Sequence, residues 1–315
     1  MSLEAIHIDF DYADENKILS DVNVRLKPRE IISVVGPSGA GKSTLLKCLA
    51  GLLPLKNGKI IIDGEVLPNP NDLLKPGHPE IAIVNQLFEL DNFFTVTENI
   101  DNQLHHLTNE IRERFLAELI DVFELNEIKD LQSKDISGGE KQRVTMACAL
   151  AKEPKYLLLD EPFVHFDFHL HQKIGEYLKQ LVELRGMGVI LVTHNGAEAL
   201  AWSDKILLIR EGKITRKYSP QSAYLNPKNL FEGRFFGELN SIYHEGKQIL
   251  FRPTQYFLEE KEKTFQVKIK FLYSNYRGYL YANYFKLENG RKIVLYSSNQ
   301  LENVDKIYVQ KNKGK

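Results

Sequence analysis

The sequence predicts an α/β domain followed by a small all-β domain, and three observations support this prediction. Up to about residue 235, short apolar runs of strand type alternate with helical patterns. A glycine-rich loop joins one of these runs to a helix, a context typical of phosphate binding. After residue 236, the helical period gives way to an alternation of apolar and polar positions. Apolar strands separated by helices imply a mostly parallel sheet that is covered on both faces.

Residues 1–235 contain the elements of the expected α/β domain. Its strands are short apolar runs at 30–36, 58–64, 80–86, 155–162 and 188–194. A helix is expected at 43–53, and a helical insertion at about 87–136. Within that insertion, four apolar positions have the spacing of one face of an amphipathic helix: Ile111, Phe115, Leu119 and Val122. Ligands of such a sheet are expected at the carboxyl ends of its strands.

Residues 236–315 have the character of a β domain. Five apolar side chains alternate with mostly polar ones, at Phe265, Val267, Ile269, Phe271 and Tyr273. This period of two is typical of a half-buried strand. The dipeptide at 289–290, Asn-Gly, lies between two strand-like runs and predicts a hairpin. We therefore expect an OB-like barrel.

Composition narrows the functional classes. The chain has 315 residues and a net charge of −1, which gives no electrostatic case for a nucleic-acid partner. Its two cysteines, Cys48 and Cys148, lie in apolar helix-like runs, so a reducing cytosol is expected. The N-terminus has neither the basic start nor the apolar stretch of a signal peptide. The apolar runs are too short to span a bilayer, so any membrane role is expected to be peripheral.

The stretch GPSGAGKST matches the phosphate loop of P-loop NTPases, with a strand before it and a helix after it. Its backbone N–H groups can surround phosphate oxygens, Lys42 can reach the β- and γ-phosphates, and the Ser43 hydroxyl can ligate Mg²⁺. The predicted ATP-binding residues of the loop are Gly36, Pro37, Ser38, Gly39, Ala40, Gly41, Lys42, Ser43 and Thr44.

Two adjacent carboxylates end the apolar run YLLLDEP. Asp160 is expected to hold Mg²⁺, and Glu161 to orient or deprotonate the attacking water. Further along, ISGGEKQR places a serine and two glycines at the start of a helix. Free N–H groups and the positive end of the helix dipole make this a second anion site.

The phosphate loop, ISGGEKQR, LLLDEP and a later strand ending in VTH occur in this order, and together they resemble the nucleotide-binding ATPase subunit of ABC transporters. The resemblance covers about 235 residues. It implies that Tyr12 stacks on adenine, that Gln86 contacts Mg²⁺ and signals to a transmembrane partner, and that His194 contacts the γ-phosphate. Taken singly, these residues could instead be a core aromatic, a strand cap and a hydrogen-bonded loop residue, and Phe10 is a neighbouring candidate for the adenine contact.

The resemblance also implies a head-to-tail homodimer in which each ATP lies between two chains. The phosphate loop of one chain would face a signature formed in trans by Ser137, Gly138, Gly139 and Glu140 of the other. Asp167 is implied in the loop that communicates across the dimer. Two positions depart from the family pattern: Glu140 replaces the usual glutamine, and the pair at 165–166, His-Phe, is bulkier than usual. We expect Glu140 to be tolerated, and the pair leaves communication between subunits in doubt.

The C-terminal domain, beginning near ILFRPTQYFL, resembles the TOBE-type regulatory domain of bacterial importer ATPases for sugars, polyamines, sulfate, molybdate or ferric iron. This implies a cytoplasmic Mg-ATPase, peripheral on the inner face of the membrane, with transmembrane permease subunits as partners and a solute-binding protein as an indirect one. The short domain favours an inorganic ion or a polyamine as cargo. Three alternatives remain open: a soluble ATPase acting on ribosomes or DNA, an exporter ATPase, and a switch governed by a ligand-sensing β domain.

Overall fold

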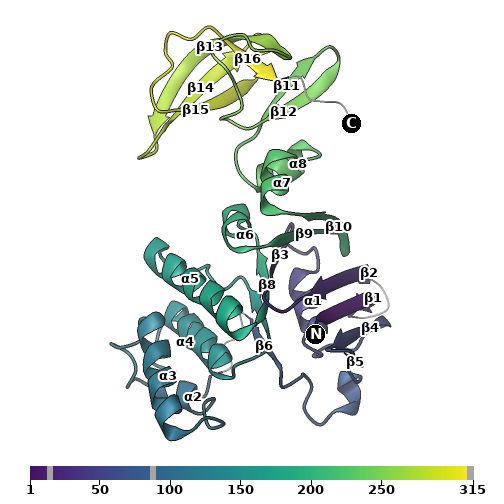
Figure 1. Ribbon diagram of the computed structural model, residues 1–315, viewed down its shortest axis with the longest axis vertical. Coiled ribbons are helices and arrows are strands. Elements are labelled where there is room, and N and C mark those ends of the chain that lie inside the picture. The colour runs from purple at the N-terminus through teal and green to yellow at the C-terminus, as the bar shows by residue number, and fades with distance from the viewer. Residues whose placement is uncertain (13–16, 86–89, 311–315) are drawn as a thin grey trace. The chain divides into compact units, whose positions relative to one another are not determined.

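The computed structural model describes residues 1–12, 17–85 and 90–310. The chain divides into two compact units, Met1–Pro220 and Gln221–Lys315. The first is an α/β unit, and the second is dominated by antiparallel strands, as the sequence predicts. Figure 1 shows the elements of each unit. No helix among the described residues is both long enough and apolar enough to cross a membrane.

A six-stranded sheet forms the centre of the first unit, in the order β10-β9-β3-β8-β7-β6. Its strands are β3 (Ile31–Val35), β6 (Ile81–Val84), β7 (Tyr156–Asp160), β8 (Gly188–Thr193), β9 (Lys205–Arg210) and β10 (Lys213–Tyr218). All pairs are parallel except that of β10 with β9. Both β7 and β8 are buried along their whole length, as strands covered on both faces should be. The carboxyl ends of the parallel strands therefore meet at one edge of the sheet.

A second, antiparallel sheet has the order β2-β1-β4-β5. Its strands are β1 (Leu3–Asp11), β2 (Lys17–Leu26), β4 (Asn57–Ile62) and β5 (Glu65–Val66). The run at 58–64, expected in the parallel sheet, forms β4 instead and pairs antiparallel with β1. Its first three residues are exposed, and Ile60 and Ile62 are buried while Ile61 between them is only partly buried, as in a strand with one covered face.

Helices cover the central sheet on two sides. They are α1 (Lys42–Leu49), the 3₁₀ turn η1 (Pro70–Asp72), α2 (Val96–Asp101), α3 (Asn109–Val122), α4 (Gly138–Ala151), α5 (Phe168–Arg185) and α6 (Gly196–Trp202). Figure 1 shows α2, α3, α4 and α5 gathered on one side of this unit. Neighbouring residues of β7 enter different cores: Leu157 packs with the cluster of these helices, and Leu158 with the cluster of α1 and the antiparallel sheet.

The predicted helical insertion at about 87–136 contains α2 and α3. Phe115 and Leu119 of α3 are buried and Val122 is partly buried, as the spacing predicts. The prediction is wrong for Ile111, which is 54% exposed, because it lies in the first turn of α3, where the core does not reach. Ile120 is buried instead, so the buried residues of α3 lie in the C-terminal half of the helix.

The second unit contains α7 (Pro220–Leu225), which begins at the boundary, and α8 (Leu230–Phe235), followed by six strands. The strands are β11 (Asn240–His244), β12 (Lys247–Phe251), β13 (Thr264–Tyr276), β14 (Tyr281–Leu287), β15 (Lys292–Ser297) and β16 (Lys306–Gln310). They form a two-stranded sheet and a four-stranded sheet in the order β15-β14-β13-β16. The expected hairpin joins β14 to β15, and Gly290 has the positive φ of 83° that such a turn requires.

The boundary between the units comes before the predicted one at 235, because residues 221–235 pack with the second unit. Arg252, which is 0% exposed, explains this difference. Its guanidinium donates to four backbone carbonyls, those of Tyr224, Gly233, Gly237 and Glu238. These bonds satisfy carbonyls at and after the ends of α7 and α8. The arginine of the RP dipeptide thereby ties both short helices to the β strands.

Candidate functional site

The phosphate loop connects β3 to α1 and depends on its glycines. Gly39 and Gly41 have positive φ values of 76° and 96°, which favour glycine. At Gly36, a Cβ would lie 2.2 Å from the carbonyl oxygen of Ile209, so a side chain is excluded there. Helix α1 begins after Gly41 without a side-chain cap. Its first N–H groups thus remain available to an anion at the positive end of the helix dipole.

Lys42 lies inside this loop, with its side chain folded back over it. Its ammonium nitrogen donates to the carbonyl oxygens of Gly36 and Pro37, each at 3.0 Å. The residue is buried, and burial lowers the pKa of the ammonium, while the charges of Glu161 and Asp160 oppose this change. The two carboxylates therefore help to keep a positive charge within the loop.

Asp160 ends β7 next to the loop and is 8% exposed. Burial raises the pKa of its carboxyl and nearby Glu161 raises it further, whereas a hydrogen bond from Ser43 lowers it. A buried carboxylate beside a hydroxyl presents the hard oxygen ligands that Mg²⁺ prefers. Among the described residues, no group of three or more His, Cys, Asp or Glu side chains could hold a metal alone. Asp160 and Ser43 together fit an ion that takes its other ligands from phosphate and water.

Glu161 and His194 meet at the ends of β7 and β8. The Nδ1 atom of His194 lies 2.9 Å from Oε1 of Glu161. The backbone of Glu161 has a positive φ of 51°, and its N–H donates to the carbonyl of Val192 at 2.9 Å. His194 thus positions the carboxylate of Glu161, and the bond to Val192 positions its backbone. The carboxylate is partly accessible to solvent. This arrangement places a base and an imidazole next to the phosphate loop.

Gln142 is a part of this site that sequence reasoning missed. This buried residue of α4 donates from Nε2 to the carbonyl oxygens of Glu161 at 3.1 Å and Pro162 at 2.8 Å. It therefore links the helix of the ISGG stretch to the backbone of the catalytic candidate. Its place in the polar run EKQR gave no signal, although a polar residue on the buried side of a helix is expected to have a partner.

The structure distinguishes the two aromatic candidates near the start of the chain. Phe10 is 4% exposed and belongs to a core cluster, whereas Tyr12 is 63% exposed. The two rings pack edge to face at 4.8 Å between centroids. The Tyr12 hydroxyl lies 3.4 Å from Oγ1 of Thr44 in α1. Of these two rings, Tyr12 is therefore the one exposed beside the phosphate loop.

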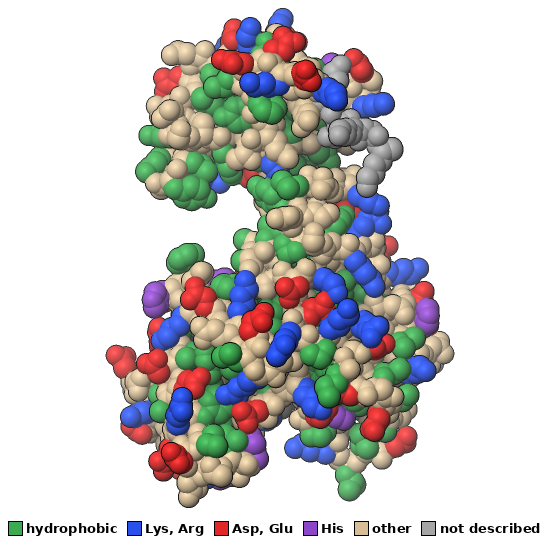
Figure 2. All heavy atoms as spheres, viewed as in Figure 1, with side chains coloured by type: hydrophobic (Ala, Val, Ile, Leu, Met, Phe, Trp, Pro, Cys, Tyr) green, Lys and Arg blue, Asp and Glu red, His purple; other side chains and the backbone are tan. Residues whose placement is uncertain are grey.

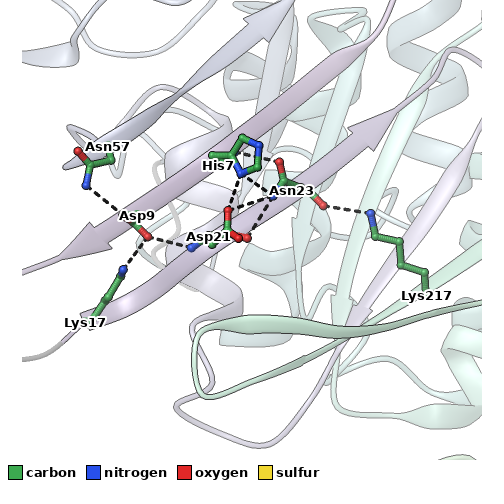
Figure 3. Close-up of polar contacts among 7 residues, drawn as sticks. All are labelled: His7, Asp9, Lys17, Asp21, Asn23, Asn57 and Lys217. Atoms are coloured by element: carbon green, nitrogen blue, oxygen red, sulfur yellow. Dashed lines mark hydrogen bonds and ion pairs between the residues drawn. The ribbon is translucent and has the colours of Figure 1, made fainter.

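A polar network joins β1, which ends just before Tyr12, to its two neighbouring strands (Figure 3). The Asp9 carboxylate accepts hydrogen bonds from the side chains of Lys17 and Asn57 and from the backbone N–H of Asp21. These bonds lower the pKa of Asp9 to about 2, the one from Lys17 having the largest effect. Because β1, β2 and β4 all contribute to the network, it fixes the register of the strands at their exposed side.

Ser137 caps α4 through a reciprocal pair of interactions with Glu140. The N–H and the hydroxyl of Ser137 both donate to Oε2 of Glu140 at 2.7 Å, and the Glu140 N–H donates back to Oγ of Ser137 at 3.4 Å. Arg143 lies 3.9 Å from the other carboxylate oxygen. The bonds from Ser137 lower the pKa of Glu140. Gly138 and Gly139 follow at the first positions of the helix, where added Cβ atoms would meet no close contact.

The loop after Glu161 accommodates its bulky residues. Asp167 caps α5 by accepting a hydrogen bond from the N–H of Leu170 at 2.9 Å. Phe166 packs against the core cluster, and His165 lies next to Gly139. A cavity of about 310 Å³ with Phe163, Asp167 and His194 in its lining opens beside this loop. Gln86, the expected contact to Mg²⁺ and to a membrane partner, lies outside the described residues.

Comparison with known proteins gives consistent relatives. A model of the family described as ABC transporter matches residues 19–164. The spermidine/putrescine import ATP-binding protein PotA of Haemophilus influenzae is 37% identical over 227 residues, which are 71% of this chain and 60% of that protein. The protein of the same name from Mannheimia succiniciproducens is 31% identical over 320 residues, 90% of this chain and 85% of the relative. The chain spans about 60% of the length of the first curated relatives it matches.

Solved structures give a similar result. A dimer of the ATP-binding cassette MJ0796 in a post-hydrolysis state, bound to ADP and Pi, is 28% identical. It matches with a TM-score of 0.61 over 69% of this chain and 98% of that one. The ATP-binding subunit of an ABC transporter matches with a TM-score of 0.64 at 26% identity, over 71% of this chain and 92% of its own length.

Proposed function

This chain belongs to the ABC transporter family of ATP-binding proteins, and from this premise we propose that it is the Mg-dependent ATPase that powers import through a membrane transporter. The observation that carries the proposal is the meeting of Glu161 and His194 beside a phosphate loop that already holds Lys42. Phosphoryl transfer requires positioning and charge neutralisation more than covalent catalysis, and these residues can provide both.

Binding of the triphosphate falls to the loop and α1. The N–H groups after Gly39 and Gly41 surround the phosphates, and Lys42 exchanges its two carbonyl partners for β- and γ-phosphate oxygens. Tyr12 stacks on the adenine. Ser43 and Asp160 would hold Mg²⁺, and Gln86 is proposed as a further contact. When bound, this ion would supply charge neutralisation for the phosphates.

Hydrolysis falls to the residues at the ends of β7 and β8. Glu161 orients the attacking water and accepts its proton on the carboxylate. His194 holds this carboxylate through Nδ1 and contacts the γ-phosphate. Gln142 fixes the backbone of Glu161 from the side of α4. Each group is oriented before the nucleotide arrives, which reduces the entropic cost of reaching the reactive geometry.

Two copies form a head-to-tail dimer and complete each other's sites. Ser137, Gly138 and Gly139 of one copy bind the γ-phosphate held by Lys42 of the other, and Asp167 lies in the loop that connects the two sites. The side-chain partners that the structure gives Ser137 and Glu140 all lie within 137–143. The solved dimeric cassette with ADP and Pi supports this assembly.

The remaining partners are proposed by similarity to relatives that are named as import ATP-binding proteins. Transmembrane permease subunits bind the helical insertion, a solute-binding protein delivers the cargo, and the ATPase remains peripheral on the cytoplasmic face. Of the expected cargoes, a polyamine is favoured because the relatives are named for spermidine and putrescine import. The β strands of the second unit form a TOBE-like regulatory domain.

The chemistry is tested with Glu161→Gln. This change keeps the shape of the side chain but removes the base, so steady-state hydrolysis should fall by about 10²–10⁴-fold while ATP binding persists. In ATP and Mg²⁺, the variant should accumulate as a dimer by sedimentation, and wild-type protein should not. A variant that hydrolyses ATP at the wild-type rate would contradict the assignment. Uptake of labelled spermidine or sulfate in cells that lack this chain then tests the cargo.

A further inference from the structure

The hydroxyl of Ser137 has a single proton, and the structure shows where it goes. It is donated to Oε2 of Glu140, which also accepts the Ser137 N–H. Both donors of the serine at the signature are therefore directed at a carboxylate of their own chain. A phosphate oxygen that arrives at this serine has to compete with that carboxylate for the same hydrogen bond.

The carboxylate is only partly neutralised by its surroundings. Arg143 approaches Glu140 no closer than 3.9 Å, at the weak end of an ion pair. The bonds from Ser137 lower the pKa of Glu140, so the side chain is charged at neutral pH. Its charge lies at the first turn of α4, where the helix dipole would otherwise favour an incoming anion.

A second helix shows that the cap itself is ordinary. Thr95 and Glu98 form the same reciprocal pair at the start of α2, with both donors of Thr95 directed at Oε2 of Glu98 at 2.7 and 3.0 Å. A capping box of this kind accepts glutamine as well as glutamate at its fourth position. The charge at 140 is thus not required for the helix start, and its consequence lies in what the motif binds.

We propose that Glu140 is a carboxylate gate that raises the ATP concentration needed for two copies to close on each other. This rests on the proposed function, in which Ser137 contacts the nucleotide of the partner copy. For closure, the Ser137 hydroxyl turns from Oε2 of Glu140 to the γ-phosphate, and the displaced carboxylate stays in the same helical turn as this serine. The Ser137 hydroxyl stays bonded to Glu140, and the two copies stay apart, until the nucleotide on the partner replaces this internal bond.

The test compares Glu140→Gln with Glu98→Gln, each in the Glu161→Gln background. Both changes remove one charge and keep the capping geometry, but only the first lies in the signature. Titration with ATP and Mg²⁺, followed by sedimentation, gives the ATP concentration at half-maximal dimer. Glu140→Gln should lower this concentration by about fivefold, because it removes the repulsion between the carboxylate and a partly solvated phosphate. Glu98→Gln should leave it unchanged.

Glu140→Ala provides a second measurement that does not depend on the amide. It removes the charge and the competing acceptor together, so it too should lower the ATP concentration for closure. An unchanged or higher concentration in both Glu140 variants would overturn the gate. If the Glu161→Gln parent does not dimerise with ATP at all, the proposed function fails first, and the two failures are therefore distinguishable.

Discussion

Helices α1 and α4 both begin beside glycines, yet they present opposite electrostatics to an anion. At the start of α1, no side chain caps the N–H groups, and Lys42 adds a buried positive charge. At the start of α4, Ser137 and Glu140 are hydrogen-bonded to each other, and the carboxylate of Glu140 adds a negative charge. Figure 2 shows acidic and basic side chains interspersed over the visible face of the first unit, so the contrast is a local feature of these helix starts.

The difference indicates that a glycine-opened helix is not by itself a complete phosphate site. The start of α1 combines uncapped N–H groups with a buried cation of the same chain. At the start of α4, the cap of Ser137 is already paired with Glu140. Under the proposed function, α1 would bind ATP first and α4 would contact it only when two copies close, which is the order expected if ATP closes the dimer and hydrolysis opens it.

Removal of Lys42 should have the largest effect on ATP binding and hydrolysis, because it removes the buried positive charge that distinguishes the start of α1 from that of α4. Lys42→Ala should weaken ATP binding and reduce hydrolysis by about 10²–10³-fold, since the triphosphate loses its buried cation. Fluorescent nucleotide titration and phosphate release measure the two effects. Lys59→Ala, at an exposed position of β4, is the matched control and should behave as wild type. Tight ATP binding by Lys42→Ala would show that the two helix starts do not differ in the way described.

Ser137→Arg tests the other side of the comparison. The bulky cation should block approach of the partner, so hydrolysis should fall by at least about 100-fold while ATP binding by the monomer remains intact. Thr95→Arg disrupts the equivalent cap of α2 and controls for the loss of a helix start, which costs about 1 kcal/mol. Equal loss of monomer binding in Ser137→Arg would mean that the motif acts within its own chain.

Tyr12 lies beside α1, so its removal should weaken ATP binding at the start of α1 without changing the start of α4. Tyr12→Ala should weaken ATP binding about tenfold through loss of base stacking, and Tyr12→Phe should retain most of the affinity. Phe10→Ala should instead lower the free energy of unfolding by about 3–5 kcal/mol, because that ring is buried. Calorimetry with ATP and urea unfolding separate the two results. A Tyr12→Ala protein with unchanged affinity would remove this tyrosine from the site.

Asp9 should show the smallest effect, and only in acid. Its pKa is lowered from the ordinary 3.8 to about 2, so its bonds stabilise the fold above pH 4 and this contribution is lost as the pH falls toward 2. Asp9→Asn should therefore be less stable than wild type at neutral pH, and the difference should shrink between pH 4 and 2. Urea unfolding at several pH values measures it. A difference that is independent of pH would contradict the charged network.

Much of the site could be predicted from the sequence, because its motifs are contiguous. The phosphate loop and the pair Asp160-Glu161 each follow a run of apolar residues, and such runs are reliable signals of buried parallel strands. The neighbouring order of β7 and β8 then brings Glu161 and His194 together. Local pattern and sheet topology act in the same direction here.

The rest depended on contacts between distant residues. The bond from Gln142 to Glu161, the choice between Tyr12 and Phe10, and the membership of β4 in the antiparallel sheet are set by packing that no local pattern records. The division at 220, before the predicted 235, reflects the bonds of Arg252 to carbonyls many positions before it. Even the departure at Glu140 became interpretable only when its partner was seen to be Ser137.

The most direct test of the central claim mixes two inactive variants. Lys42→Ala lacks the lysine of the phosphate loop, and Ser137→Ala lacks the signature hydroxyl without adding bulk that would block closure. Both carry Glu161→Gln to prevent turnover. In a mixed dimer, the loop of the second variant faces the intact signature of the first. Retention of labelled ATP after rapid gel filtration should be low for either variant alone, because ATP bound by a single chain is released during filtration. Retention should rise in the mixture, toward one nucleotide per mixed dimer. A mixture that retains no ATP would contradict a site shared between two copies.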